Sequence, residues 1–436
     1  MPSVTPTSDP LSAFDDLLNL ERSQSFHAGQ HSVGLETMEA LLRALKNGGM
    51  EGPAGRPPLC VHVAGSEGKT SVTVRIAAGL AAAGLRVGTY TSPHLRQPAE
   101  RLCIDGMLPE PELLRSSVDT VCAAMASGGL KPSWFEALTA TALVLFGRAG
   151  VGAAVWETGL GGRLDATRVL PADLCVLTTV SLEHTAVLGN TLAEIAQEKA
   201  GILRPGVPLV CGSWLPDEAR EVVLAAAEKR SCPVRLVDPS PETERGLVDA
   251  RNEALVAAVL EELSLGRGLE PASLKKACAA AFVQSIEGRD DLREGVLYDG
   301  AHTVAAAGAL AKRLAERVPG PVILGVTSGR DGVAMAAALR PVAQPLVLTR
   351  APGERGVDPE QMAEALKKKA EVKHGTSGGE LFIEPDPHRA LALGRRLAQA
   401  RVPSPKESPE NVRITVTGSL HLVGLLLPPS PSERLP

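Results

Sequence analysis

The side chains best suited to chemistry in this sequence lie between residues 65 and 71, which read G-S-E-G-K-T-S. They directly follow a short apolar run at Leu59, Val61 and Val63. A strand, a tight glycine turn and the start of a helix, in this order, form the layout of a phosphate-binding loop. The glycines let the backbone approach the anion, the lysine reaches the terminal phosphates and a hydroxyl holds Mg2+. We therefore predict that a nucleotide is bound by Gly65, Ser66, Gly68, Lys69, Thr70 and Ser71.

The glycine spacing leaves a second interpretation open. Two residues separate Gly65 from Gly68, whereas the general phosphate-loop pattern places four between its glycines. An ordinary strand-to-helix turn with a solvated Lys69 would have the same composition. Glu67 is also unusual, because a carboxylate beside a triphosphate is repelled unless it points away or pairs with a cation. Nucleotide binding is the favoured interpretation, since strand, glycines, lysine and hydroxyls arrive in the order that the chemistry needs.

Polar side chains follow three further predicted strands. The strands are expected at 86–90, 152–156 and 174–180, and the polar residues after them are Ser92, Glu157 and His184. Carboxyl ends of parallel strands meet at one edge of a sheet, where ligands bind. Convergence at this edge makes Glu157 and His184 a plausible metal site. Each is weak evidence alone, because S-P-H at 92–94 is most often a plain turn and a single histidine is most often a structural hydrogen-bonding group.

Strands and helices alternate along the whole chain and must position these side chains. In the first part we expect helices at 36–46, 110–126, 133–149, 216–230, 250–264 and 271–281, and further strands at 207–212 and 233–237. The segment at 286–291, I-E-G-R-D-D, is predicted to be a linker, after which the alternation restarts. There we expect strands at 296–298, 321–326, 345–349 and 412–416, and helices ending near 317 and at 332–340, 358–370 and 386–400.

This pattern predicts an α/β protein of two domains. Residues 1–285 would form an N-terminal domain with a mostly parallel sheet, similar to a P-loop ATPase, and residues 286–436 a C-terminal Rossmann-like α/β domain. The second domain contains no phosphate loop. The first residues, to about 12, are rich in Ser, Thr and Pro and are expected to be frayed.

Composition narrows the class of protein. A net charge of -5 argues against a general affinity for nucleic acid or for anionic membranes. The seven cysteines are scattered and never occur as C-x-x-C, which fits reduced thiols and no zinc site. No apolar run reaches the roughly 20 residues of a membrane helix, and no signal peptide is recognisable. We expect a cytoplasmic protein that binds small molecules, has no nucleic-acid or membrane partner and is a monomer.

Taken together, the motifs resemble the folylpolyglutamate synthase and dihydrofolate synthase family of the Mur ligase superfamily. The matching blocks run in family order from about residue 31 to residue 424. They read Y-T-S-P-H-L (90–95), E-T-G-L-G-G-R-L-D-A-T (157–167), E-H-T-A-V-L-G-N-T (183–191), I-A-Q-E-K-A-G-I (195–202), D-G-A-H (299–302) and T-G-S-L-H-L-V-G (417–424).

The resemblance implies an ATP-dependent amide ligase that adds L-glutamate to a folate or dihydropteroate carboxylate through an acyl phosphate. It implies ATP and two Mg2+ as cofactors, with the second domain closing over the nucleotide. The implied metal-binding residues are Thr70, Ser71, Ser92, Glu157, His184 and Lys199, and the implied catalytic residues are Lys69, His184 and Lys199. The implied nucleotide contacts outside the loop are Asn252, Arg289, Asp299 and His302.

Lys199 has two opposed interpretations. Beside Glu194 and Glu198 it would ordinarily be a solvated surface cation. The resemblance instead implies a lysine carbamylated by CO2, which serves as an anionic metal ligand. Carbamylation needs the neutral amine, which at a pKa near 10.4 is about one lysine in 2,000 at pH 7. Burial or nearby cations must therefore lower the pKa of Lys199.

Several positions depart from the family pattern. Glu67 and Thr70 stand where the folate branch usually has Asn and Gly, Glu183 where Asp is usual, and Arg168 where Asn is usual. Thr303 and Val304 replace Asn-Pro, and the segment 238–252 is shorter than expected. Two alternatives therefore stay open. The protein could be a ligase of the same mechanism acting on another acid and amine, or a nucleotide-binding protein that no longer ligates.

Overall fold

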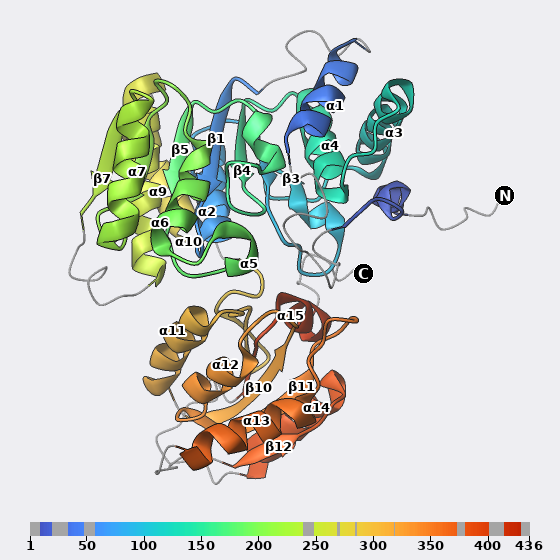
Figure 1. Ribbon diagram of the computed structural model, residues 1–436, viewed down its shortest axis with the longest axis vertical. Coiled ribbons are helices and arrows are strands. Elements are labelled where there is room, and N and C mark those ends of the chain that lie inside the picture. The colour runs from blue at the N-terminus through green and yellow to red at the C-terminus, as the bar shows by residue number, and fades with distance from the viewer. Residues whose placement is uncertain are drawn as a thin grey trace, which may run out of the picture. The chain divides into compact units, whose positions relative to one another are not determined.

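The computed structural model describes residues 9–19, 34–47, 57–238, 248–267, 271–283, 286–317, 319–372, 380–400 and 414–428. Contacts within the chain divide it into two compact units, Met1–Gln284 and Ser285–Pro436. Each unit is an α/β structure with its own sheet (Figure 1). The predicted two-domain α/β fold is thus confirmed.

A seven-stranded sheet forms the centre of the first unit, with strand order β3-β2-β4-β1-β5-β6-β7. The strands are β1 (Leu59–Ala64), β2 (Val87–Tyr90), β3 (Leu102–Ile104), β4 (Ala153–Glu157), β5 (Leu174–Leu177), β6 (Leu209–Gly212) and β7 (Val234–Val237). All neighbours are parallel except β3, which pairs antiparallel with β2. The carboxyl ends of β1, β2, β4 and β5 therefore lie at one edge, as the sequence predicted.

Helices cover both faces of this sheet because the central strands are buried on both sides. The helices are α1 (Glu36–Asn47), α2 (Lys69–Ala82), α3 (Pro111–Gly128), α4 (Trp134–Ala149), α5 (Thr185–Leu188), α6 (Leu192–Lys199), α7 (Asp217–Lys229), α9 (Val248–Arg267) and α10 (Pro271–Val283). Helices α2, α9 and α10 pack on one face around Val61 and Val63. Helices α1, α3 and α4 cover Trp156 on the other face, and α6 and α7 cover Cys175.

The second unit has a six-stranded sheet of order β12-β11-β10-β13-β9-β8. Its strands are β8 (Asp291–Arg293), β9 (Val296–Asp299), β10 (Gly320–Val326), β11 (Ala343–Arg350), β12 (Leu381–Ile383) and β13 (Ile414–Thr417). Its helices are α11 (Val304–Ala315), α12 (Gly332–Leu339), α13 (Pro359–Val372), α14 (Pro387–Ala400) and α15 (Leu420–Leu426). Only β8 is antiparallel to its neighbour, so the sheet is mostly parallel, as a Rossmann-like unit requires.

Several short elements, α5 among them, differ from the sequence prediction. The three-residue edge strands β3, β8 and β12, and the final helix α15, were not expected, because such short segments carry too little periodicity. The expected linker at 286–291 instead contains a bridge between Ile286 and Arg289 and the first residue of β8. At the N-terminus Pro10–Phe14 form a 3-10 turn capped by Asp9, where a frayed segment was expected to about residue 12. The expected fraying of residues 1–8 falls outside the described part of the chain.

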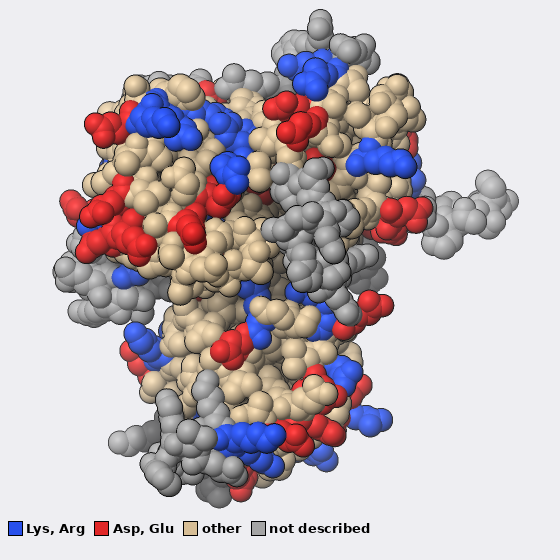
Figure 2. Space-filling view, in the orientation of Figure 1, with Lys and Arg blue, Asp and Glu red and all other residues tan. Residues whose placement is uncertain are grey.

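None of the described helices is both long enough and apolar enough to cross a lipid bilayer. Charged side chains of both signs lie on the face of each unit that Figure 2 shows.

Candidate active site

The phosphate-binding loop between β1 and α2 requires glycine at both of its glycine positions. Gly65 has φ +152° and Gly68 has φ +80°, a conformation that side-chain-bearing residues rarely adopt. A Cβ on Gly65 would lie 1.8 Å from the hydroxyl oxygen of Thr178, and one on Gly68 would lie 2.5 Å from Oδ1 of Asn252. The two-residue spacing therefore still yields a tight loop that opens onto the first N–H groups of α2.

Two threonines that sequence reasoning missed support this loop. The backbone N–H of Ser66 donates to the carbonyl of Thr179 at 2.9 Å, and that of Glu67 donates to the Thr179 hydroxyl at 2.9 Å. The Thr178 hydroxyl donates to the carbonyl of Glu67. Strand β5 ends at Leu177, three residues before the prediction, and the hydroxyls of the two threonines that follow it bond to the loop. The sequence feature that could have indicated this support is the pair of hydroxyl side chains directly after the strand that neighbours β1.

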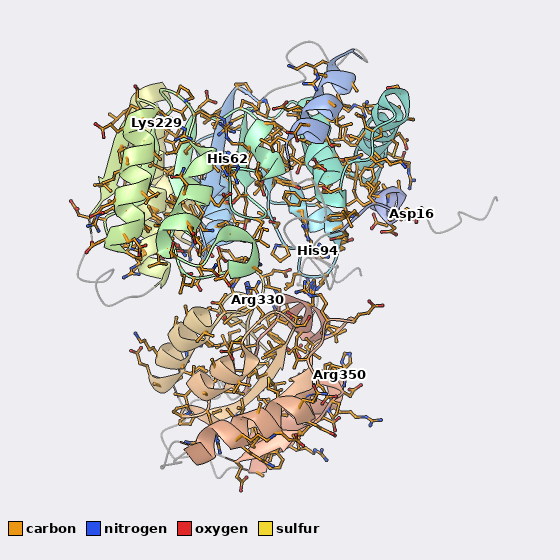
Figure 3. All side chains as sticks on the ribbon, in the orientation of Figure 1. Asp16, His62, His94, Lys229, Arg330 and Arg350 are labelled. Atoms are coloured by element: carbon orange, nitrogen blue, oxygen red, sulfur yellow. The ribbon has the colours of Figure 1, made fainter. Side chains whose placement is uncertain are left out.

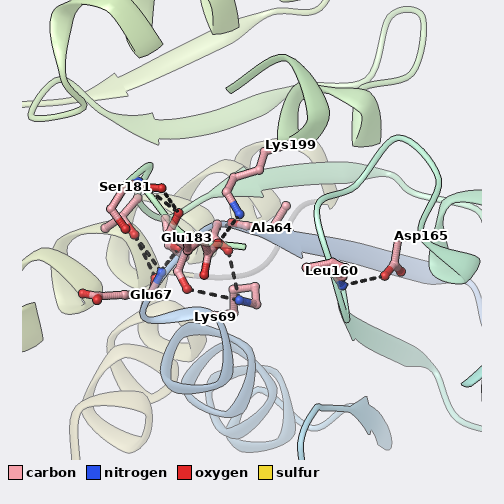
Figure 4. A network of polar contacts seen from close by, with 12 residues as sticks. Ala64, Glu67, Lys69, Leu160, Asp165, Ser181, Glu183 and Lys199 are labelled. Atoms are coloured by element: carbon pink, nitrogen blue, oxygen red, sulfur yellow. Dashed lines mark hydrogen bonds and ion pairs between the residues drawn. The ribbon is translucent and has the colours of Figure 1, made fainter. Parts of the chain in front are cut away.

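The backbone of Glu67, held by these threonines, directs its side chain away from Lys69 (Figure 4). This is one of the two arrangements in which a carboxylate near a triphosphate is tolerated.

Glu157 contacts two other predicted metal-binding residues, Thr70 and Ser92. Its side chain is 1% exposed at the end of β4. The Thr70 hydroxyl donates to its Oε1 at 3.0 Å, and the backbone N–H of Ser92 donates to its Oε2 at 3.3 Å. A buried carboxylate beside the Thr70 hydroxyl, next to a phosphate loop, suits Mg2+, which takes one or two protein carboxylates and completes its shell with phosphate oxygens. The residues present therefore fit the implied metal. Ser71 follows Thr70 on α2.

Lys69 and Lys199 lie near one carboxylate, that of Glu183. Lys69 Nζ donates to the carbonyls of Gly65 at 3.0 Å and Ser66 at 3.3 Å. Lys199 is 1% exposed, and its Nζ lies 2.7 Å from Oε1 of Glu183 (Figure 4). Burial, helped by the charge of Lys69, lowers the pKa of Lys199 to about 8 although Glu183 opposes the shift. Lys199 is therefore not the solvated cation of the ordinary interpretation.

His184 is exposed and lies on the segment after β5, where it precedes α5. Its φ of +45° is left-handed, a strained conformation for a residue with a side chain. Burial would raise the pKa of the Glu183 carboxyl group, but the attraction of Lys199 and Lys69 outweighs this and the pKa is lowered. The charge of His184 adds to the lowering. The structure thus brings His184, Glu183, Lys199 and Lys69 into one electrostatic neighbourhood.

Among the described residues, no three His, Cys, Asp or Glu side chains gather as a metal-ligand group.

Three of the four predicted nucleotide contacts outside the loop belong to the second unit and cluster around Gly300. Arg289 Nη1 donates to the Gly300 carbonyl at 3.4 Å, and His302 Nδ1 donates to the same carbonyl at 2.8 Å. Asp299 accepts from the Ala301 N–H at 2.9 Å, and burial raises the pKa of its carboxyl group although Arg313, at 2.7 Å, opposes the shift.

Asn252, the fourth, is 2% exposed on α9 with its amide against Gly68. The roles of these four residues stay predictions.

Comparison with known proteins agrees with this fold and site. Residues 283–401 match the family model described as Mur ligase, glutamate ligase domain. A structure of a bifunctional folylpolyglutamate synthase/dihydrofolate synthase from Yersinia pestis, complexed with AMPPNP and Mn ion, has a TM-score of 0.76 and 28% identity, covering 97% of this chain and 98% of that one. A phosphate loop with this domain defines an ATP-dependent ligase of the Mur type.

Sequence relatives narrow the class. A dihydrofolate synthase/folylpolyglutamate synthase from Mycobacterium tuberculosis is 31% identical over 412 residues, covering 83% of this chain and 82% of the relative. The chain spans 40% of a probable bifunctional folylpolyglutamate synthase/dihydropteroate synthase from Halobacterium salinarum, with 34% identity over 340 residues and 70% of this chain covered. The chain belongs to the folylpolyglutamate synthase/dihydrofolate synthase family.

Proposed function

We propose that this protein is an ATP-dependent ligase that joins the amino group of L-glutamate to the carboxylate of a folate or of dihydropteroate. The contact of Thr70 and Ser92 with the buried Glu157, beside the phosphate loop, supports the proposal most directly. The names of the relatives and the glutamate ligase domain support the choice of substrates.

Chemically, the site must bring together two anions, the triphosphate and the acid to be activated. The acid carboxylate attacks the γ-phosphorus of ATP and ADP leaves. The glutamate amine then attacks the acyl carbon and phosphate leaves, so one amide forms for each ATP consumed. Lys69, the loop N–H groups and the start of α2 would stabilise the transferring charge. Thr70, Ser92 and Glu157 would hold a Mg2+ that neutralises the triphosphate.

Lys199 would become a carbamate in the active protein. A pKa of about 8 leaves about one amine in ten neutral at pH 7, against about one in 2,000 for an ordinary lysine. The carbamate would replace the ion pair with Glu183 and, with His184, supply ligands for a second metal. We expect Lys199→Ala to abolish ligation with little loss of ATP affinity. A carbamate carbon signal with 13C-bicarbonate, absent in this variant, would identify the modification, and unchanged turnover would remove Lys199 from the mechanism.

Purified protein with Mg-ATP tests the function itself. We expect phosphate release that requires both glutamate and either 7,8-dihydropteroate or tetrahydrofolate, with a product heavier by one glutamyl residue in mass spectrometry. Release only with a different acid or amine would identify another Mur-type ligase, an outcome that Glu67 and Thr70 in the loop would explain. An absence of nucleotide binding would contradict ligation altogether.

A further inference from the structure

We propose that a buried hydrogen-bonded chain of Arg204, His62, Thr167 and Asp165, here called the bracing chain, positions the metal-binding side of the ligase site. None of the four is expected to touch substrate. The proposal rests on the proposed function, because it takes Glu157 and Lys199 as residues of the metal site. It adds a physical reason for the polar groups found deep in the sheet. His62 lies on β1, well away from His94 at the ligand edge (Figure 3).

The donors and acceptors of the bracing chain allow one arrangement. Arg204 can only donate, so His62 Nδ1, 3.1 Å from Arg204 Nη1, must accept. The proton of a neutral imidazole is then on Nε2, which donates to the Thr167 hydroxyl oxygen at 2.8 Å. Thr167 has one hydroxyl proton, and it donates this proton to Oδ1 of Asp165. The chain thus runs from a guanidinium to a carboxylate through a neutral histidine.

Asp165 connects this chain to the backbone that follows Glu157. Its Oδ2 accepts the N–H groups of Gly159 at 2.8 Å and Leu160 at 2.9 Å, two and three residues after Glu157. Its Oδ1 also accepts the Thr167 N–H at 3.0 Å. The carboxylate is 6% exposed, and its four donors replace the hydration that a buried anion loses. The loop after Glu157 is therefore folded around one buried carboxyl group, whose pKa is raised by burial and lowered by these hydrogen bonds.

Lys199 is tied to the same loop. The N–H of Arg163 donates to the Glu198 carbonyl at 2.8 Å, and Gly162 lies so close to the Lys199 carbonyl that a Cβ would be 2.9 Å from it. Arg204, at the other end of the bracing chain, donates to the carbonyl of Ile202 at 2.7 Å, directly after the helix that carries Lys199. A shift of the loop would therefore move the ligands of both metal sites together.

These contacts distinguish positioning from catalysis. His62 is 1% exposed and Thr167 is fully buried, so neither meets bound substrate. Residues that orient a metal ligand typically change metal affinity 10- to 100-fold when altered. Thr167→Val should therefore weaken the binding of Mn2+ by the protein saturated with AMPPNP by about ten-fold or more. Affinity for AMPPNP without metal should be unchanged.

The experiment measures Mn2+ binding by electron paramagnetic resonance in the full-length protein with AMPPNP. Thr167→Ser keeps the hydroxyl and should restore wild-type affinity. Thr141→Val is the matched control, since Thr141 is also fully buried but its hydroxyl donates to Ala137 within α4. It should leave Mn2+ affinity within about two-fold, whereas a control that weakens Mn2+ as much as Thr167→Val would show a general effect of lost stability and overturn the proposal.

A second measurement does not depend on metal or activity. In 15N NMR spectra of wild-type protein, His62 should be the neutral Nε2–H tautomer. An Nδ1–H tautomer or a charged imidazole would overturn the bracing chain even if Thr167→Val weakens Mn2+ binding. Wild-type Mn2+ affinity in folded Thr167→Val would overturn the positioning role while leaving the ligase proposal intact. Failure of the wild-type protein to bind Mn2+ with AMPPNP would contradict both proposals.

Discussion

Gly68 has little conformational freedom in the phosphate loop. Its φ of +80° is unfavourable for alanine, and a Cβ would lie 2.5 Å from Asn252 Oδ1. We expect Gly68→Ala to lose about 1–2 kcal/mol of stability from the backbone conformation. Because the loop or Asn252 must also move, nucleotide affinity should fall about ten-fold or more, equivalent to roughly 1.4 kcal/mol of lost phosphate contacts. Calorimetric titration with ATP and chemical denaturation measure the two effects.

Gly84→Ala is the matched control for this prediction. Gly84 has φ +96° just after α2, but no atom lies within 4 Å of a Cβ built there. The variant should show a similar loss of stability and an unchanged ATP affinity. Equal ATP affinities for Gly68→Ala and wild type would mean that the loop does not bind the triphosphate.

The buried His62 should contribute to a loss of protein stability in acid. Burial holds the pKa of its imidazole well below 6.5, and the nearby charges of Arg204 and Arg168 lower it further. Below pH 6.5 the unfolded chain takes up this proton and the folded chain does not, so the free energy of unfolding decreases as pH falls. The contribution is about 1.4 kcal/mol per pH unit until the folded pKa is reached.

Denaturation of wild type and His62→Gln between pH 7 and 5 measures this component. Between pH 7 and 5 the free energy of unfolding should decrease less for the variant than for wild type. The difference should correspond to the uptake of up to about one proton fewer on unfolding. Parallel curves would show that His62 is already charged in the folded protein.

Residues at the ends of predicted strands could be located from sequence, since topology alone brings Thr70, Ser92 and Glu157 together at one edge of the sheet. Residues whose role depends on packing could not be located from the sequence. His62 occupies an ordinary strand position, and Thr178 resembles any buried threonine until the loop is folded against it. The departure of Glu183 from the family pattern was visible, but its pairing with Lys199 was not.

At the scale of elements, two helical glycines should respond oppositely to the same substitution. Gly79 lies in α2, and a Cβ there would meet Leu260 Cδ1 at 2.8 Å and the Ala277 carbonyl oxygen at 3.2 Å. Gly308 lies in α11 with nothing within 4 Å of a Cβ. Alanine is favoured over glycine in a helix by about 1 kcal/mol, so Gly308→Ala should stabilise the protein by up to that amount.

Gly79→Ala should instead destabilise by about 1–2 kcal/mol, because α9 and α10 must move from α2 to accommodate the methyl group. Thermal and urea unfolding of both variants measure the difference. A stabilised Gly79→Ala would mean that these helices pack more loosely than the contacts indicate.

Long elements were predictable because their periodicity is sustained. Helices α3, α4, α7 and α14, and the buried strands β1 and β10, lie within two residues of the expected bounds. Strands β3, β8 and β12 were missed because three residues carry no pattern, and edge pairing is decided by the neighbouring strand.

At the scale of the whole molecule, the two units make separate sheets and separate cores. The restart of strand-helix alternation after the segment 286–291 indicated where the second unit begins. We expect a fragment of residues 285–436 to fold cooperatively by itself, as judged by circular dichroism and urea unfolding, because its buried side chains contact one another within the unit.

The nucleotide contacts that the family resemblance implies for Arg289 and His302 can be tested by ATP binding. The phosphate loop belongs to the first, whereas Arg289 and His302, which share the Gly300 carbonyl, belong to the second. If these two residues reach ATP as the family resemblance implies, a fragment of residues 1–284 should bind Mg-ATP more weakly than the whole chain, by about ten-fold for every 1.4 kcal/mol of lost contacts. The Arg289→Ala, His302→Ala double variant of the whole chain should then approach the affinity of that fragment. Lys312→Ala, which removes a cation from the last turn of α11, is the control and should bind like wild type. If the fragment and the double variant both bind Mg-ATP as tightly as the wild-type whole chain, the first unit binds ATP alone.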